Sequence, residues 1–519
     1  MINKNINFLF LLIIFTLIFN NIPKVIQVSF VGSVLQTKLV FYPIFIGLIY
    51  TLYYQYKYKN VLVNLDKFLK FIVIYFSVML ISLVIGLYSY PYYDLVLNGP
   101  VTQIEKLPKV INILNNFGIN IDEKILTAFW MIARTIKNAL FEMLYTFGGA
   151  YMAYCWYHIA WQTAFKILMK AILSSLIVIF GYCCVELFYL AGNENAKNIL
   201  FTITPYIHII KSDGTWWPPL LWKNQIRSVF AEPSFFSIWA AFALPFVWYK
   251  LICANILKTR CLFIIITIIF TVLIFLTNAR TGVALLCGEF VCLLIYVLFL
   301  HNKLIIKKFL VISLCTICAF LLSNSFTNNF MTAKSVSPET YFKNNLGSIA
   351  EKDARSNGAR YSTIYANIMI GIDNPILGVG KGLVPAYMPD YFPDFSKNNR
   401  EVQNWIKYQN EEGILKMPIP SFSAYSLTFA ESGIVGLFCY LFPAFFLIYN
   451  ILKRLYRNKE KIELAILLIA LLGMLASGFS NTLNVTYCYW ILLGLGYAMC
   501  FGKENDVKDN GDTGSRQEH

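Results

Sequence analysis

The residues best suited to chemistry lie in the segment Arg227–Trp239, RSVFAEPSFFSIW, where a polar loop changes into an apolar run. Proline belongs in the first turn of a helix, because it lacks an N–H and has a fixed φ. Glu232 is therefore expected at the N-cap and Ser234 in the first turn. The N–H groups of such a helix end attract phosphate oxygens, and Arg227 supplies paired donors to the same kind of anion. The segment predicts an anion site that contains a carboxylate, with a capped helix beside an interfacial arginine as the alternative.

Further cationic residues follow in the second half of the chain. Arg280 lies between two apolar runs in NARTG, Arg355 and Arg360 lie in the most polar part of the chain, and Lys381 follows the glycine-rich turn ILGVG. Tyr361 is a candidate substrate contact beside Arg360. Taken singly, these residues are equally consistent with interfacial or solvated charges and an ordinary turn. On one side of a membrane they predict a cationic pocket that suits a lipid-linked diphosphate.

A second carboxylate, Glu431, is embedded in an apolar stretch, AESGIVGLF. Intramembrane carboxylates usually have a charged partner, so we expect it to pair with an arginine. Glu142, Glu186 and Glu289 also lie in apolar runs and are interpreted as structural or pairing groups. With only four histidines and no DxD or Walker-type signature, we expect neither a metal site nor a cofactor.

The elements that must position these residues are transmembrane helices. Residues are 58% hydrophobic and only 14% charged, and apolar runs near the length that crosses a bilayer recur throughout. The sequence predicts an all-α polytopic membrane protein with about twelve transmembrane helices. The net charge of +15 is concentrated in short loops between apolar runs. That pattern reflects membrane topology and argues against a nucleic-acid partner.

The basic clusters also predict the orientation of the chain. Each dense cluster follows an even-numbered apolar run, so both termini are expected in the cytoplasm. Residues 1–323 then form helices one to nine with outer loops 88–124 and 191–228. Residues 324–424 form one large extracytoplasmic loop, 425–502 form helices ten to twelve, and 503–519 form a disordered cytoplasmic tail. The three arginines at positions 227, 280 and 360 share the outer face.

Four motifs in this order resemble the bacterial O-antigen polymerase (Wzy) family within the O-antigen ligase/polymerase superfamily. They are RSVFAEPSFF, NARTG, ARYSTIYANIMIGIDNPILGVGKG and AESGIVGLF, and the resemblance covers residues 227–438. Ligases of this superfamily carry His, then Asn, Ser or Gln, then nine residues and GxxG. Here Ser423, Gly433 and Gly436 fit that pattern, but Phe422 stands at the histidine position, which favours a polymerase. Arg360 and Gly371 have the arginine, ten-residue, glycine spacing described for polymerases.

The resemblance implies polymerisation of undecaprenyl-diphosphate-linked oligosaccharide repeat units outside the bacterial plasma membrane, without metal or cofactor. The chemistry of the residues agrees with this reaction. The arginines at 227, 280 and 360 are expected to stabilise the leaving diphosphate, with Glu232 as first and Glu431 as second candidate for the base. Substrate binding is expected at Ser234, Arg355, Tyr361 and Lys381, and stacking on sugar rings at Trp216, Trp217 and Trp222, with interfacial anchoring as the alternative for these tryptophans. A chain-length regulator and a flippase of the same pathway are the expected partners, and the product is an O-antigen, a capsule or an exopolysaccharide.

Three other functions remain as alternatives. An O-antigen ligase is the nearest, and Phe422 argues against it. A polysaccharide flippase or lipid transporter usually has cationic residues along a mid-membrane cavity, whereas these arginines are predicted at one face. A structural scaffold for envelope assembly would leave Arg227 and Glu232 without a function.

Overall fold

The computed structural model describes residues 4–28, 36–58, 65–209, 225–330, 355–484 and 486–502. Within these ranges the chain is helical and contains no strand. The first half comprises α1 (Lys4–Thr16), η1 (Lys24–Ile26), α2 (Phe41–Tyr58), α3 (Leu65–Tyr88), α4 (Tyr93–Leu97), α5 (Leu107–Asn116), α6 (Glu123–Tyr145), α7 (Phe147–Tyr157), α8 (Trp161–Leu190) and α9 (Glu194–Ile207). The second half comprises α10 (Pro233–Cys253), α11 (Leu257–Leu276), α12 (Arg280–Leu300), α13 (Lys303–Phe330), α15 (Arg355–Asp373), α16 (Val384–Tyr391), η4 (Asp394–Asn398), α17 (Arg400–Glu412), α18 (Ala424–Arg457), α19 (Ile462–Ser477) and α20 (Cys488–Phe501).

The described helices confirm an all-α membrane protein. Seven of them are long and apolar enough to cross a bilayer, namely α3, α8, α10, α11, α12, α13 and α18. The apolar helices α1, α19 and α20 are shorter. The apolar run 139–156, predicted as the fourth span, is divided at Thr146, where α6 ends and α7 begins. The total of twelve spans therefore stays a prediction.

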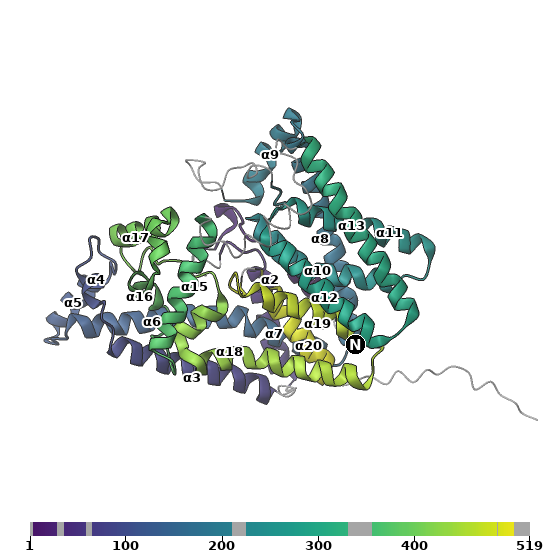
Figure 1. The fold of residues 1–519 in the computed structure, drawn as a ribbon. Helices are drawn as coiled ribbons and strands as arrows, with labels where there is room; N and C mark the ends of the chain where they lie inside the picture. The colour runs from purple at the N-terminus through teal and green to yellow at the C-terminus, as the bar shows by residue number, and fades with distance from the viewer. Residues whose placement is uncertain are drawn as a thin grey trace, which may run out of the picture.

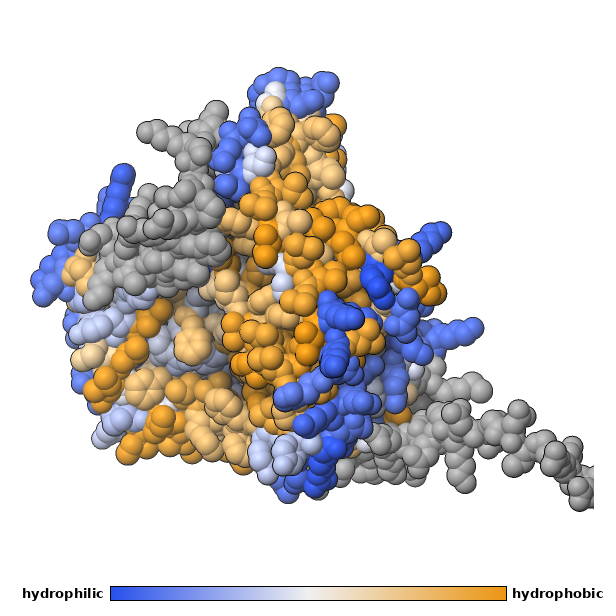
Figure 2. All heavy atoms as spheres, turned by 45° about the vertical axis from the view of Figure 1, so that its right-hand side comes forward, coloured by the Kyte–Doolittle hydropathy of each residue, from blue (hydrophilic) through white to orange (hydrophobic). Residues whose placement is uncertain are grey.

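The surface over α11 and α13 is apolar, as a lipid-facing surface must be. Figure 2 shows an extended hydrophobic area with hydrophilic residues above and below it. Ile265 on α11 and Leu314 on α13 are 54% and 61% exposed. Because so large an exposed apolar area would be unfavourable in water, we interpret it as covered by lipid tails.

The centre of the molecule is α10. In its most apolar 18-residue stretch, 83% of the helix is buried inside the protein, a far larger share than in any other helix that could cross the membrane. It packs against α11, α12 and α19 (Figure 1). Trp239, Phe242 and Trp248 fill its surroundings, while Ala240 and Ala241 let neighbouring helices approach. The start of α10 is thus held by the best-packed part of the protein.

The helices α4, α5, α16 and α17 gather at one end of the molecule (Figure 1). There a separate apolar core joins Leu83, Leu87 and Tyr90 to Leu383 and Ala386. Two of the predicted outer loops, 88–124 and 324–424, are therefore in contact and lie on one side of the protein. The described part of the larger one, from residue 355, is folded into helices rather than left as a loop.

Candidate functional site

The start of α10 has the geometry that its sequence predicts. Glu232 is the N-cap in an extended conformation, and Pro233 is the first helical residue. The hydroxyl of Ser234 donates a hydrogen bond of 3.1 Å to Glu232 Oε2. Both side chains are half-buried. The carboxylate is thus held at the helix end while it remains accessible.

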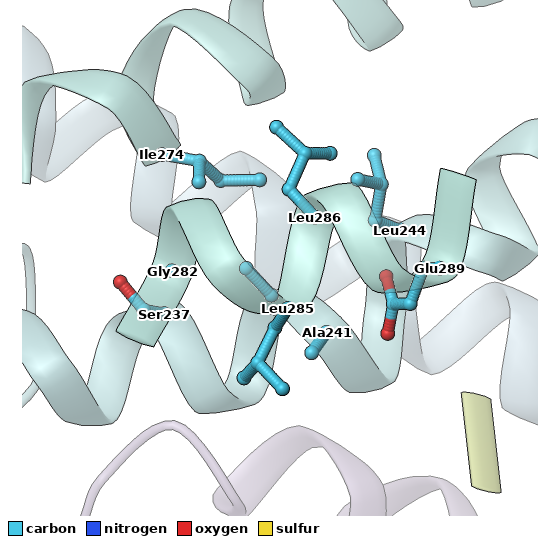
Figure 3. Close-up of a pocket in the computed structure, with 9 residues that line it drawn as sticks. Ser237, Ala241, Leu244, Ile274, Gly282, Leu285, Leu286 and Glu289 are labelled. Carbon is cyan, nitrogen blue, oxygen red and sulfur yellow. The ribbon is translucent and has the colours of Figure 1, made fainter. Parts of the chain in front are cut away.

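The start of α12 lies beside that of α10. Thr277 Oγ1 accepts a hydrogen bond of 3.1 Å from the Ala279 N–H and lies 3.2 Å from Ser237 Oγ of α10. A Cβ at Gly282 would lie 2.5 Å from the same Ser237 Oγ, so the glycine of NARTG permits this close approach (Figure 3). Arg280 is the first residue of α12 and is half-buried. Two helix N-termini, each with partial positive charge, therefore meet here.

Arg360 on α15 completes this group. Its guanidinium lies over the ring of Phe422, 5.2 Å from the centroid. Burial lowers the pKa of Arg360, the carboxylates of Glu232 and Glu401 oppose that shift, and the charge of Arg280 adds to it. Glu232 and Arg280 are thus within electrostatic range of Arg360. We call Glu232, Ser234, Arg280, Arg360 and Phe422 the arginine site.

Arg227 lies next to this site but faces inward. Its side chain is 1% exposed, and its Nη1 donates to the carbonyl of Ala231 at 3.2 Å. The neighbouring N–H of Ser228 donates to Glu186 Oε2 at 2.9 Å. The Ala231 N–H donates to Asn20 Oδ1 at 2.9 Å. These contacts fix the loop that leads into Glu232, and the predicted contact of Arg227 with substrate stays a prediction.

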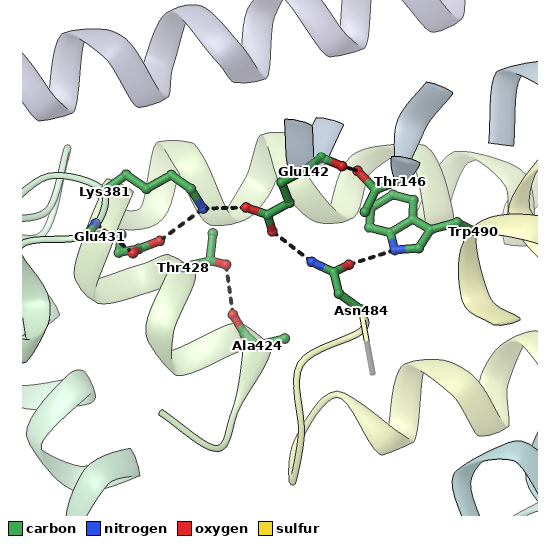
Figure 4. Close-up of polar contacts among 9 residues, drawn as sticks. Glu142, Thr146, Lys381, Ala424, Thr428, Glu431, Asn484 and Trp490 are labelled. Carbon is green, nitrogen blue, oxygen red and sulfur yellow. Dashed lines mark hydrogen bonds and ion pairs between the residues drawn. The ribbon is translucent and has the colours of Figure 1, made fainter. Parts of the chain in front are cut away.

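A second charged group surrounds Lys381 (Figure 4). Its Nζ lies 3.2 Å from Glu142 Oε2 on α6 and 3.6 Å from Glu431 Oε2 on α18. Asn484 Nδ2 donates to Glu142 Oε1 at 2.7 Å, and the Gly382 N–H donates to Glu431 Oε1 at 2.9 Å. Burial acts to lower the pKa of Lys381, yet the two carboxylates hold it well above its usual value. Among the described residues the charge partner of Glu431 is thus a lysine, not the expected arginine.

Helix α18 is broken beside this lysine. Gly433 has φ 63° and ψ −167°, so the helical hydrogen bonds are interrupted there. The N–H groups of Val379 and Gly380 donate to the carbonyls of Ala430 and Glu431, both at 2.9 Å. The turn at 375–382 therefore pairs with the broken helix. A Cβ at Gly378 would lie 2.4 Å from the Ala430 carbonyl oxygen, and one at Gly433 would lie 2.2 Å from the Ile376 carbonyl, so these two glycines permit the contact.

The remaining predicted residues are placed as follows. Tyr361 is half-buried next to Arg360, and Ser423 caps α18 by accepting from the Ser426 N–H at 3.4 Å. Gly371 faces the ring of Phe429, where a Cβ would clash. The Arg355 side chain lies outside the described residues, as do Trp216, Trp217, Trp222 and the tail 503–519.

Sequence reasoning did not find the partners of Glu142. Asn484 connects it to Trp490, whose Nε1 donates to Asn484 Oδ1 at 2.9 Å. No local pattern marks a contact between segments so far apart in the chain. In the part of the chain that the structure describes, no group of three His, Cys, Asp or Glu residues is arranged to hold a metal ion.

Comparison with known families gives one match. Residues 263–441 match the family model described as O-antigen ligase. The matched segment runs from α11 into α18 and contains Arg280, Arg360, Lys381 and Glu431, whereas Glu232 precedes it. A search of curated proteins finds no significant match.

Proposed function

We propose that this chain, whose residues 263–441 form an O-antigen ligase-like domain of the O-antigen ligase/polymerase superfamily, polymerises lipid-linked oligosaccharide repeat units. The donor and acceptor are units linked to undecaprenyl diphosphate. The observation that carries the proposal is the arginine site. It combines two half-buried arginines, one carboxylate and two helix N-termini beside helices that cross a membrane.

In the proposed reaction the sugar–diphosphate bond of the donor breaks, and a bond from the anomeric carbon to an acceptor hydroxyl oxygen forms. Negative charge develops on the leaving diphosphate, where Arg280, Arg360 and the helix N-termini stabilise it. A well-placed donor of this kind contributes roughly 3–4 kcal/mol to the transition state. Glu232 accepts the proton of the attacking hydroxyl. The hydrogen bond from Ser234 orients the carboxylate for that transfer.

The choice of polymerase over ligase rests on Phe422. It stands where ligases of the superfamily carry histidine, and its ring lies under the Arg360 guanidinium. A phenyl ring cannot take a proton, and we assign that role to the carboxylate of Glu232. The family description as O-antigen ligase keeps ligase activity as the second candidate.

The proposed location is the bacterial plasma membrane, with both termini in the cytoplasm and the arginine site on the outer face. Contacts between residues 88–124 and 355–423 support a common side for these loops. The proposed partners are the flippase that delivers repeat units and a regulator of chain length.

Glycan analysis of a deletion strain by gel ladder and mass spectrometry tests the proposal. A single repeat unit on the final acceptor, with longer chains lost, supports a polymerase. Long undecaprenyl-linked chains that are not transferred would indicate a ligase. Repeat units retained on the cytoplasmic leaflet would indicate a flippase.

A further inference from the structure

We propose that Lys381 is a positioning residue, which locks the broken helix α18 to α6 and thereby holds Arg360 and Phe422 in the arginine site. The lock consists of Lys381, Glu142 and Glu431. The catalytic consequence rests on the proposed polymerase function, whereas the lock itself does not.

The charges of the lock argue against a direct contact with diphosphate. One ammonium group lies between two carboxylates, at 3.2 and 3.6 Å, so the cluster carries a net negative charge. It therefore repels a phosphate anion. Each carboxylate also accepts a second hydrogen bond, from Asn484 or from the Gly382 N–H. The geometry suits a fixed joint between helices.

The break in α18 is what the joint stabilises. Because the helix is interrupted at Gly433, carbonyls in the preceding turn need donors from elsewhere. Val379 and Gly380 supply them, and Ser82 Oγ on α3 donates to the Glu431 carbonyl at 2.6 Å. The Ile434 N–H in turn donates to the Pro375 carbonyl at 2.8 Å. Lys381 ends this paired segment and ties it to α6.

The paired segment is directly connected to the arginine site. Helix α15, which carries Arg360, leads into it and packs along α18. Asn367 Nδ2 of α15 donates to Ser421 Oγ and Ser426 Oγ, both at 3.3 Å. Helix α18 begins at Ala424, seven residues before Glu431 and so roughly 10 Å away along the helix, and Phe422 lies two residues before that start. A shift of the break therefore moves Arg360 and Phe422 relative to Arg280 and Glu232, which belong to the separate pair α10 and α12.

A charge exchange separates this role from substrate binding. Glu142→Lys and Lys381→Glu are each made alone and then combined, because the double variant re-forms the ion pair between positions 142 and 381 while it leaves a carboxylate at position 381 beside Glu431. In proteoliposomes with purified lipid-linked repeat units, we expect each single change to lower the polymerisation rate at least tenfold. We expect the double variant to recover part of this loss and to be about threefold or more faster than the worse single variant. Lys397→Glu, which breaks an exposed pair with Asp394 at 2.7 Å, is the matched control and leaves the rate unchanged.

Amide hydrogen exchange of residues 375–383, measured without substrate, tests whether the lock holds this segment closed. We expect faster exchange at Val379, Gly380 and Gly382 in each single variant and in Lys381→Met. Exchange should be slower in the double variant than in either single variant, and Lys381→Arg should keep wild-type protection. Should the charge exchange prevent folding, the Met and Arg variants decide the question alone.

Two outcomes would overturn the proposal, and a third would separate the lock from the proposed polymerase function. A double variant no more active than the worse single variant would mean that Lys381 contacts substrate itself. Unchanged exchange in Lys381→Met would mean that there is no lock. The expected exchange pattern in a protein without polymerase activity would refute the proposed function and leave the lock standing.

Discussion

Replacement of Arg360 by alanine is the most informative single change in the arginine site. Its side chain is half-buried, within electrostatic range of Glu232 and Arg280, and its guanidinium lies over the Phe422 ring. Loss of a charged donor to the leaving diphosphate costs roughly 3–4 kcal/mol in the transition state. Loss of the contact with Phe422 adds about 0.5–1 kcal/mol. Since about 1.4 kcal/mol corresponds to a factor of ten, we expect the polymerisation rate to fall by about 300- to 4,000-fold.

The assay is chain growth in proteoliposomes, with protein amount and thermal midpoint measured for each variant. Phe422→Leu removes only the ring contact, so its rate should fall by no more than about fivefold. Arg400→Ala removes an exposed arginine at the start of α17 and should stay within about twofold of wild type. An Arg360→Ala protein that is folded and within threefold of wild type would refute the assignment of Arg360 to the leaving group.

Three further predictions concern the base, the helix break and a buried histidine. Glu232→Gln keeps the shape of the side chain but removes the proton acceptor, so kcat should fall by about 10²–10⁴-fold with KM nearly unchanged; a folded Glu232→Gln protein with the wild-type kcat would contradict the assignment of the base. Gly433→Ala forces a side chain into φ 63° and against the Ile376 carbonyl, so the thermal midpoint in detergent should fall clearly. Gly181→Ala on α8 is its control, because a Cβ there meets nothing within 4 Å. Burial and the charge of Arg227 hold the pKa of His208 well below its usual value. The unfolded chain therefore binds a proton near pH 6.5 that the folded protein does not, and stability should decline as pH falls below about 6.5. His208→Gln should flatten the thermal midpoint between about pH 7.5 and 5, and an unchanged slope would contradict the assignment.

Local rules were sufficient for the start of α10. Proline at the first helical position and glutamate before it are properties of the adjacent sequence, and the structure confirms both at Pro233 and Glu232. The grouping of Arg280 and Arg360 was also predictable, because the basic loops place both on one face. The close packing that positions the start of α12 beside α10 depends on individual contacts, such as that of Gly282 with Ser237.

Other features depend on contacts between distant segments, which one sequence does not reveal. The inward orientation of Arg227 follows from Glu186, Asn20 and the turn at Ser228, which belong to three separate parts of the chain. The pairing of Glu431 with Lys381 depends on a glycine turn that joins a broken helix. A hydrophobic run predicts the helix but not its break at Gly433, because glycine is also common in helices that only pack closely against a neighbour.

The most direct test of the central claim is reconstitution of the purified protein with one defined undecaprenyl-diphosphate-linked repeat unit as both donor and acceptor. The account predicts a ladder of lipid-linked products that differ by one repeat unit, with release of undecaprenyl diphosphate in equal amount. Transfer of the unit only to a different lipid acceptor, with no ladder, would contradict the polymerase assignment and establish a ligase instead.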